Sequence, residues 1–160
     1  MIQELQPTDF FIVKELRLEA LANNPEAFGT SEDEERLQTR EVFTDSFKTG
    51  RMFGYFEDGK LVGIAGYYTF LQSKMRHRCQ LFGVYVTPAY RGRNIASILV
   101  NTICDEASKS MHQIHLNVWT GNTEAIALYK KLGFEVYGTE PATMMIDGRK
   151  IDDHLMVKQL

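Results

Sequence analysis

The feature that most constrains this chain is a strand that passes through a basic, glycine-containing turn directly into an amphipathic helix. The strand runs from Leu81 to Val86 and ends at Thr87-Pro88. Apolar residues then recur at helical spacing, at Ile95, Ala96, Leu99, Val100, Ile103, Cys104 and Ala107. Such a turn leaves the first N–H groups of the helix without partners. Together with the helix dipole and the guanidinium groups of Arg91 and Arg93, these N–H groups predict a site for a phosphorylated ligand.

Two helices and a hairpin are predicted before this strand. After a short strand over residues 2–5, a helix starts at residues 7–9 and extends to Asn23. A capping box, Ser31-x-x-Glu34, opens one second helix, which Gly50 closes. The apolar side of that second helix is expected to be Leu37, Val42, Phe43 and Phe47. An Asp-Gly signal at residues 58–59 then joins two strands as a hairpin.

The pattern after the central helix indicates the fold class. Residues 114–118 alternate as a strand, and the order strand, helix, strand predicts a parallel pair with a right-handed crossover. Gly83 within the central strand predicts a β-bulge. A further strand begins at Phe134, and Asp147-Gly148 marks a second hairpin. We therefore expect one α+β domain over residues 1–160, with about four helices around a mixed, mostly antiparallel sheet of six or seven strands.

Composition limits the classes of function. A hydrophobic content of 44% and a charged content of 24% are ordinary for a soluble globular protein. The formal net charge of -3 argues against broad nucleic-acid binding and is permissive for a cationic substrate. The only basic group outside the central turn, Lys74, Arg76 and Arg78, is typical of a solvated loop.

The cysteines and the start of the chain predict where the protein is located, and the histidines predict that it holds no metal. Cys79 and Cys104 are isolated and are expected to be buried free thiols in a reducing cytoplasm. The start of the chain lacks a signal region, and no apolar run approaches the length of a membrane span, so we expect no membrane partner. His112 and His115 have no further ligand at metal-site spacing, and we expect no metal.

Two motifs resemble those of the GNAT superfamily, the acyl-CoA-dependent N-acyltransferases. The turn Arg91-Gly92-Arg93-Asn94-Ile95-Ala96 is similar to motif A, Gln/Arg-x-x-Gly-x-Gly/Ala, although Asn94 stands where the family usually has glycine. Residues 122–134 resemble motif B, N-x-x-A-x-x-x-Y-x-x-x-G-F, and match it at Asn122, Ala125, Tyr129, Gly133 and Phe134. The resemblance covers residues 79–134 and implies a GNAT-like fold in which the central parallel strands splay apart.

The resemblance also implies how acetyl-CoA would bind. The pantetheine arm would lie between the splayed strands and pair with the free backbone of one of them, while the turn holds the pyrophosphate. The implied cofactor-binding residues are Val84, Tyr85, Val86, Arg91, Gly92, Arg93, Asn94, Ile95, Ala96, Asn117, Asn122 and Ala125.

The implied reaction is the direct attack of a primary amine of a small molecule on the thioester in a ternary complex, with coenzyme A as the product. An alkyl amine with a pKa near ~10.4 is mostly protonated at neutral pH, so a base or a water relay must remove a proton. A main-chain N–H near Val84 would stabilise the oxyanion, and Tyr129 would be the catalytic acid for the departing thiolate. Phe28 and Gln80 are candidates for contact with the acceptor.

The sequence does not decide which group is the general base or which molecule is the acceptor. Gln80 occupies the position where some family members carry a glutamate. Glu26, Glu32, Glu35 and an ordered water chain are the alternatives. A protein N-terminal or lysine acetyltransferase and a non-catalytic acyl-CoA-binding module are the alternative functions, and a homodimer is compatible with the sequence.

Overall fold

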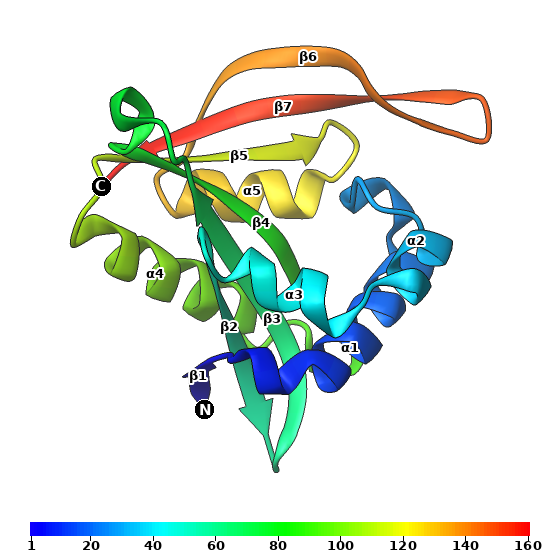
Figure 1. The fold of residues 1–160 in the computed structure, drawn as a ribbon. Coiled ribbons are helices and arrows are strands. Elements are labelled where there is room, and N and C mark those ends of the chain that lie inside the picture. The colour runs from blue at the N-terminus through cyan, green and yellow to red at the C-terminus, as the bar shows by residue number, and fades with distance from the viewer.

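One sheet of seven strands organises the fold, and the computed structural model describes all 160 residues (Figure 1). The strands lie in the order β1-β2-β3-β4-β5-β7-β6. Neighbouring strands are antiparallel except β4 and β5, which are parallel. Their bounds are β1 (Ile2–Glu4), β2 (Gly50–Glu57), β3 (Lys60–Thr69), β4 (Arg78–Val86), β5 (Gln113–Trp119), β6 (Glu135–Ile146) and β7 (Arg149–Gln159). The predicted α+β class with one parallel crossover is confirmed.

Five α-helices cover the two faces of the sheet. They are α1 (Phe10–Asn23), α2 (Glu32–Leu37), α3 (Arg40–Ser46), α4 (Ile95–Ser108) and α5 (Thr123–Lys131). Helices α4 and α5 contribute to one apolar core, and α1 and α3 contribute to another. Met52 and Phe53 are adjacent on β2 and belong to different cores, so the two cores lie on opposite faces. None of the helices combines the length and the apolar content needed to cross a membrane.

Strands β4 and β5 pair over a short distance only. Three residue pairs join them, Arg78–Gln113, Cys79–Ile114 and Gln80–His115. Beyond Gln80, β4 has no ladder partner on its β5 side, and the backbone there is free for other hydrogen bonds. The two central strands therefore diverge, as the resemblance implies.

A β-bulge lies in β4 where the strands diverge. Gly83 has a φ of +64°, which favours glycine. Across the ladder, Gly66 is opposite Phe82 and Ile64 is opposite Tyr85, so two residues of β4 oppose one residue of β3. The predicted bulge at Gly83 is confirmed.

The predicted second helix is in fact two helices. Ser31 and Glu34 form the expected capping box of α2, but the backbone leaves the helix at Gln38 (ψ 125°). Thr39 then caps α3 through its side chain. Because of this break, Leu37 and Val42 do not lie on the single apolar side that was predicted. Leu37 is 80% exposed and Val42 is 54% exposed. Phe43 alone of the four predicted residues is fully buried, and Gly50 belongs to β2.

Candidate active site

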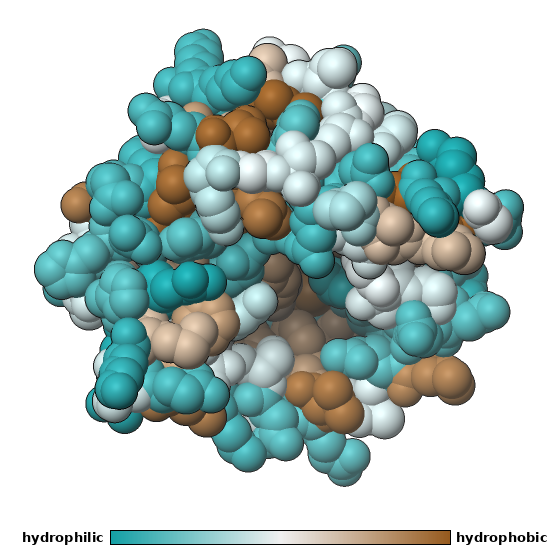
Figure 2. Space-filling model, turned by 90° about the horizontal axis from the view of Figure 1, so that it is seen from above, coloured by the Kyte–Doolittle hydropathy of each residue, from teal (hydrophilic) through white to brown (hydrophobic).

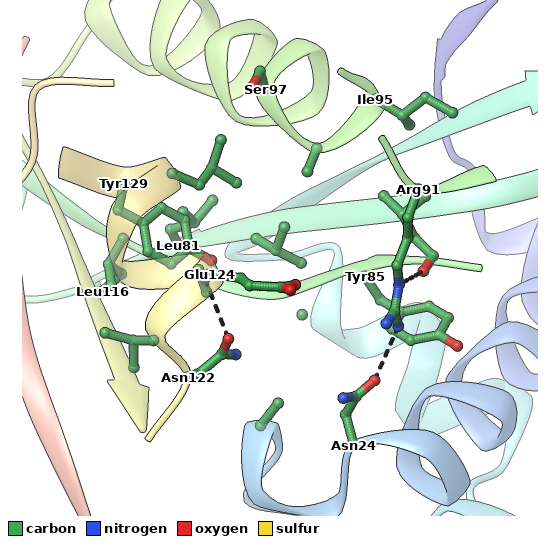
Figure 3. Close-up of a pocket in the computed structure, with 18 of the residues that line it drawn as sticks. Asn24, Leu81, Tyr85, Arg91, Ile95, Ser97, Leu116, Asn122, Glu124 and Tyr129 are labelled. Carbon is green, nitrogen blue, oxygen red and sulfur yellow. Dashed lines mark hydrogen bonds between the residues drawn. The ribbon is translucent and has the colours of Figure 1, made fainter. Parts of the chain in front are cut away.

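A cavity of about 500 Å³ lies where β4 and β5 diverge. Its walls come from both strands, the N-terminus of α4, helix α5 and the loop that follows α1 (Figure 3). Seen from above, the molecule has a hollow with an apolar floor and a largely hydrophilic rim (Figure 2). All predicted cofactor-binding residues except Arg93 line the cavity, as do Tyr129 and Phe28. Gln80 lies outside the lining.

The turn before α4 presents free N–H groups to this cavity. Gly92 and Asn94 both have left-handed backbone angles, with φ values of +75° and +63°. The first helical hydrogen bond runs from the N–H of Ile98 to the carbonyl of Asn94, at 3.1 Å. The N–H groups of residues 95–97 therefore have no partner within the helix, and the helix dipole adds positive potential there. This arrangement suits an anionic group such as a phosphate.

The two arginines of the turn have partners within the protein. Arg91 donates from Nε to the carbonyl of Val86 at 3.0 Å and from Nη2 to Oδ1 of Asn24 at 3.1 Å (Figure 3). Arg93 pairs with Glu57 at 2.8 Å and lies over the ring of Tyr90. Both N–H groups of Nη1 and the second N–H of Nη2 of Arg91 have no partner within the protein, so the turn can offer them to a ligand together with its backbone N–H groups.

Tyr129 of α5 is buried with its ring against Phe134, at 5.7 Å between ring centroids. Burial raises the pKa of the Tyr129 phenol above its ordinary value, and no hydrogen bond or charge opposes this effect. The phenol is therefore protonated at neutral pH and can donate a hydrogen bond into the cavity. Asn122 caps α5, because its Oδ1 accepts the N–H of Ala125 at 3.2 Å.

The glutamates considered as bases are all paired with arginines. Glu26 pairs with Arg149 at 2.6 Å, Glu32 pairs with Arg36, and Glu35 pairs with Arg17 at 2.8 Å. Glu35 is also buried, with 5% of its side chain exposed. Gln80 donates to Oδ1 of Asn117 at 3.0 Å, which fixes the amide of Asn117 at the cavity wall.

Several cavity residues carried no clear signal in the sequence. They include Asn24, Ala27, Ser97, Trp119, Glu124 and Leu128. Glu124 is the only carboxylate in the lining, and in Figure 3 it lies between Tyr129 and Arg91. Its place two residues after Asn122, in the first turn of α5, is the one signal that could have identified it.

The diverging strands, the turn with free N–H groups and the buried phenol together form a cavity whose chemistry suits a phosphate-bearing ligand. Residues 13–134 match the Acetyltransferase (GNAT) family. The chain belongs to this family, and the resemblance seen in its two motifs is confirmed.

Relatives with curated names share part of the chain. The L-amino acid N-acetyltransferase AaaT of Escherichia coli is 32% identical over 80 residues, which cover 48% of this chain and 49% of the relative. The spermidine N(1)-acetyltransferase of Vibrio cholerae is 31% identical over 78 residues, which cover 48% of this chain and 45% of the relative. The chain thus spans about half the length of these relatives.

A solved structure shares the whole fold. The Salmonella typhimurium protein yncA, solved with its cofactor acetyl-CoA, superposes with a TM-score of 0.85 at 22% identity. The superposition covers 100% of this chain and 93% of that protein. The predicted GNAT-like fold is confirmed.

Proposed function

We propose that this protein transfers the acetyl group of acetyl-CoA to a primary amine of a small molecule, by direct attack in a ternary complex. The observation that carries this proposal is the cavity itself, which has an anion-binding turn at one side and a protonated, buried phenol at the other. Family membership supports the reaction class. The names of the two curated relatives support an amine acceptor.

The residues present fit acetyl-CoA. The N–H groups of residues 95–97 would bind the pyrophosphate, and the free edge of β4 would pair with the amides of the pantetheine. Asn117 and Asn122 would contact the same arm from the opposite wall. The apolar residues between these polar groups would exclude water from the thioester.

The chemical step then needs two hydrogen bonds from the protein and an acceptor for one proton. The N–H of Val84, at the bulge, would donate to the carbonyl oxygen as the C–N bond forms and negative charge develops there. The hydroxyl of Tyr129 would donate a hydrogen bond to the sulfur as the C–S bond breaks. The proton lost by the amine would pass to water or to Glu124, the only carboxylate in the cavity lining, because the glutamates at positions 26, 32 and 35 are held in ion pairs. Gln80 and Phe28 would lie on the acceptor side.

The unpaired thiols Cys79 and Cys104 suit a protein of the reducing cytoplasm.

A ligand panel and a turnover assay test this proposal. Acetyl-CoA and coenzyme A should raise the melting temperature, whereas ATP and NAD should not. Release of free coenzyme A should require both acetyl-CoA and an amine. Binding of acetyl-CoA without turnover on small amines or peptides would favour the non-catalytic module, and turnover on peptides alone would favour a protein acceptor. No stabilisation by acetyl-CoA at saturating concentration would refute the proposal.

A further inference from the structure

Arg17 of α1 is held rigidly by Glu35 of α2. Its Nε donates to Oε1 of Glu35 and its Nη2 donates to Oε2, both at 2.8 Å. The Glu35 side chain is 5% exposed and the Arg17 side chain is 18% exposed. Two parallel hydrogen bonds fix the plane of the guanidinium as well as its position.

The third nitrogen of this guanidinium has no partner. Nη1 of Arg17 makes no hydrogen bond or ion pair within the protein, because both bonds to Glu35 use the other edge of the group. It lies 3.7 Å from the point that a Cβ atom on Gly83 would occupy, and outside residues 82–84 no other heavy atom lies within 4 Å of that point. Gly83 lines the cavity at the bulge. Arg17 itself is not among the residues that line the cavity, so this positioned donor lies next to Gly83, one residue removed from the cavity wall.

The structure assigns Arg17 to the carboxylate of the acceptor, and so the acceptor class to free α-amino acids. This inference rests on the proposed acetyl transfer. Such a carboxylate would accept a hydrogen bond from Nη1 while its α-amine, one carbon away, reaches the thioester at the bulge. Phe28, Phe82 and Trp119 line the same cavity and suit an apolar side chain.

Other amines have no carboxylate beside the amine that could accept a hydrogen bond from Nη1 of Arg17. The N-terminal amine of a protein has an amide in place of the carboxylate. A lysine side chain or a polyamine has no carboxylate near its amine, and a polyamine would bring further positive charge to Arg17. The fixed guanidinium therefore discriminates within the class of amines, which the anion-binding turn and Tyr129 cannot do.

Matched acceptors test the inference. L-Leucine, L-leucinamide and isoamylamine share one side chain and differ only in the group beside the amine, and phenylalanine, its amide and phenethylamine form a second series. We expect kcat/KM for at least one amino acid to exceed that of its amide and of its decarboxylated amine by at least about tenfold. If no acceptor is turned over, calorimetry on the protein loaded with coenzyme A measures the same preference as affinity.

Two variants locate the preference at Arg17. Arg17→Lys keeps a charge for Glu35 but loses the planar donor, and Arg17→Met/Glu35→Leu removes both charges so that no buried carboxylate is left alone. In each variant, kcat/KM for the amino acid should fall at least about tenfold through KM, and that of isoamylamine should change less than about twofold. Arg36→Met is the control, because Arg36 is an exposed arginine of α2. Circular dichroism verifies folding.

The possible failures are distinct. Equal use of amino acids, amides and decarboxylated amines would overturn the inference and leave the proposed function intact. Equal losses for all acceptors in the Arg17 variants would assign Arg17 to the thioester and would also overturn it. No acetyl-CoA binding would refute the proposed function first.

Discussion

Nη2 of Arg91 donates a hydrogen bond of 3.1 Å to Oδ1 of Asn24, and this bond joins the turn before α4 to the end of α1. The same guanidinium lies over the ring of Tyr85, with 5.6 Å from Cζ to the ring centroid. A phosphate that attracts Arg91 would thus compete with Asn24 on the acceptor side of the cavity. We therefore expect cofactor binding and the position of the loop after α1 to be linked through the side chain of Arg91.

Arg91→Ala should weaken acetyl-CoA binding by several-fold, measured by calorimetry, because it removes a positive charge and a potential donor beside the phosphates. Asn24→Ala is the matched control, since it removes the hydrogen bond between the two residues and keeps the charge. We expect Asn24→Ala to bind acetyl-CoA as tightly as the parent protein or more tightly. Unchanged affinity in Arg91→Ala would remove Arg91 from the phosphate site.

Tyr129→Phe should lower kcat by about a hundredfold and change acetyl-CoA affinity by less than about twofold, because the ring keeps its packing and only the donor is lost. Tyr137→Phe, which alters an exposed phenol, is the control. Since burial raises the pKa of Tyr129, its proton should stay in place up to and beyond pH about 10. Equal turnover in Tyr129→Phe and the parent protein would contradict this role. It would also be contradicted if kcat of the parent fell with rising pH below that value and Tyr129→Phe did not show this fall.

Asn94→Gly should bind acetyl-CoA within about twofold of the parent, because Asn94 already has the left-handed backbone that glycine would adopt. Asn94→Val should bind more weakly and melt at a lower temperature, since a β-branched residue is strained by about 1–2 kcal/mol or more at this angle. Calorimetry and thermal unfolding measure both effects. A large gain of affinity in Asn94→Gly would show that the asparagine side chain crowds the ligand.

Gly83→Ala and Gly59→Ala separate backbone strain from function. Both glycines have positive φ, +64° and +76°, so each substitution should destabilise the fold by about 1–2 kcal/mol. Gly59 lies in the turn between β2 and β3, whereas Gly83 faces the cavity and Arg17. We expect only Gly83→Ala to lose activity. Similar activities at equal fractions of folded protein would exclude a role for the open space at the bulge.

Cys79 and Cys104 should not react with an aromatic disulfide reagent in the folded protein at pH 8. Burial, with a smaller effect of Cys104, raises the pKa of the Cys79 thiol to about 12, and burial also raises the pKa of Cys104. Both thiols should react at once in guanidinium chloride, which is the control. Fast modification of the native protein would show that the core opens readily, and it would also interfere with the assay of coenzyme A release.

Local patterns explain why much of the fold was predictable. The apolar run before Thr87-Pro88 and the helical repeat after Ile95 depend on near neighbours, and so do the Asp-Gly hairpins. The break at Gln38 was missed because Leu37 and Val42 imitate the spacing of one continuous apolar face. Only the capping side chain of Thr39 indicated it, and threonine within a helix is a weak signal.

The site was predictable where it depends on the backbone and much less where it depends on distant partners. Helical spacing alone places Asn122 and Tyr129 on one wall. The bond from Arg91 to Asn24 joins residues 67 apart, and the ion pair of Arg17 and Glu35 joins two helices. Contacts of this kind follow from the packed structure, so no pattern in the sequence could have indicated them.

The short pairing of β4 and β5 has a mechanical consequence. Only three ladder pairs join the sheet block β1–β4 to the block β5–β7–β6, and the middle pair contains Cys79, which is fully buried. Because this ladder is short, the angle between the two blocks should depend on how the core packs around Cys79. A larger or smaller side chain at Cys79, which does not line the cavity, should therefore change the width of the space between β4 and β5 without contacting a ligand.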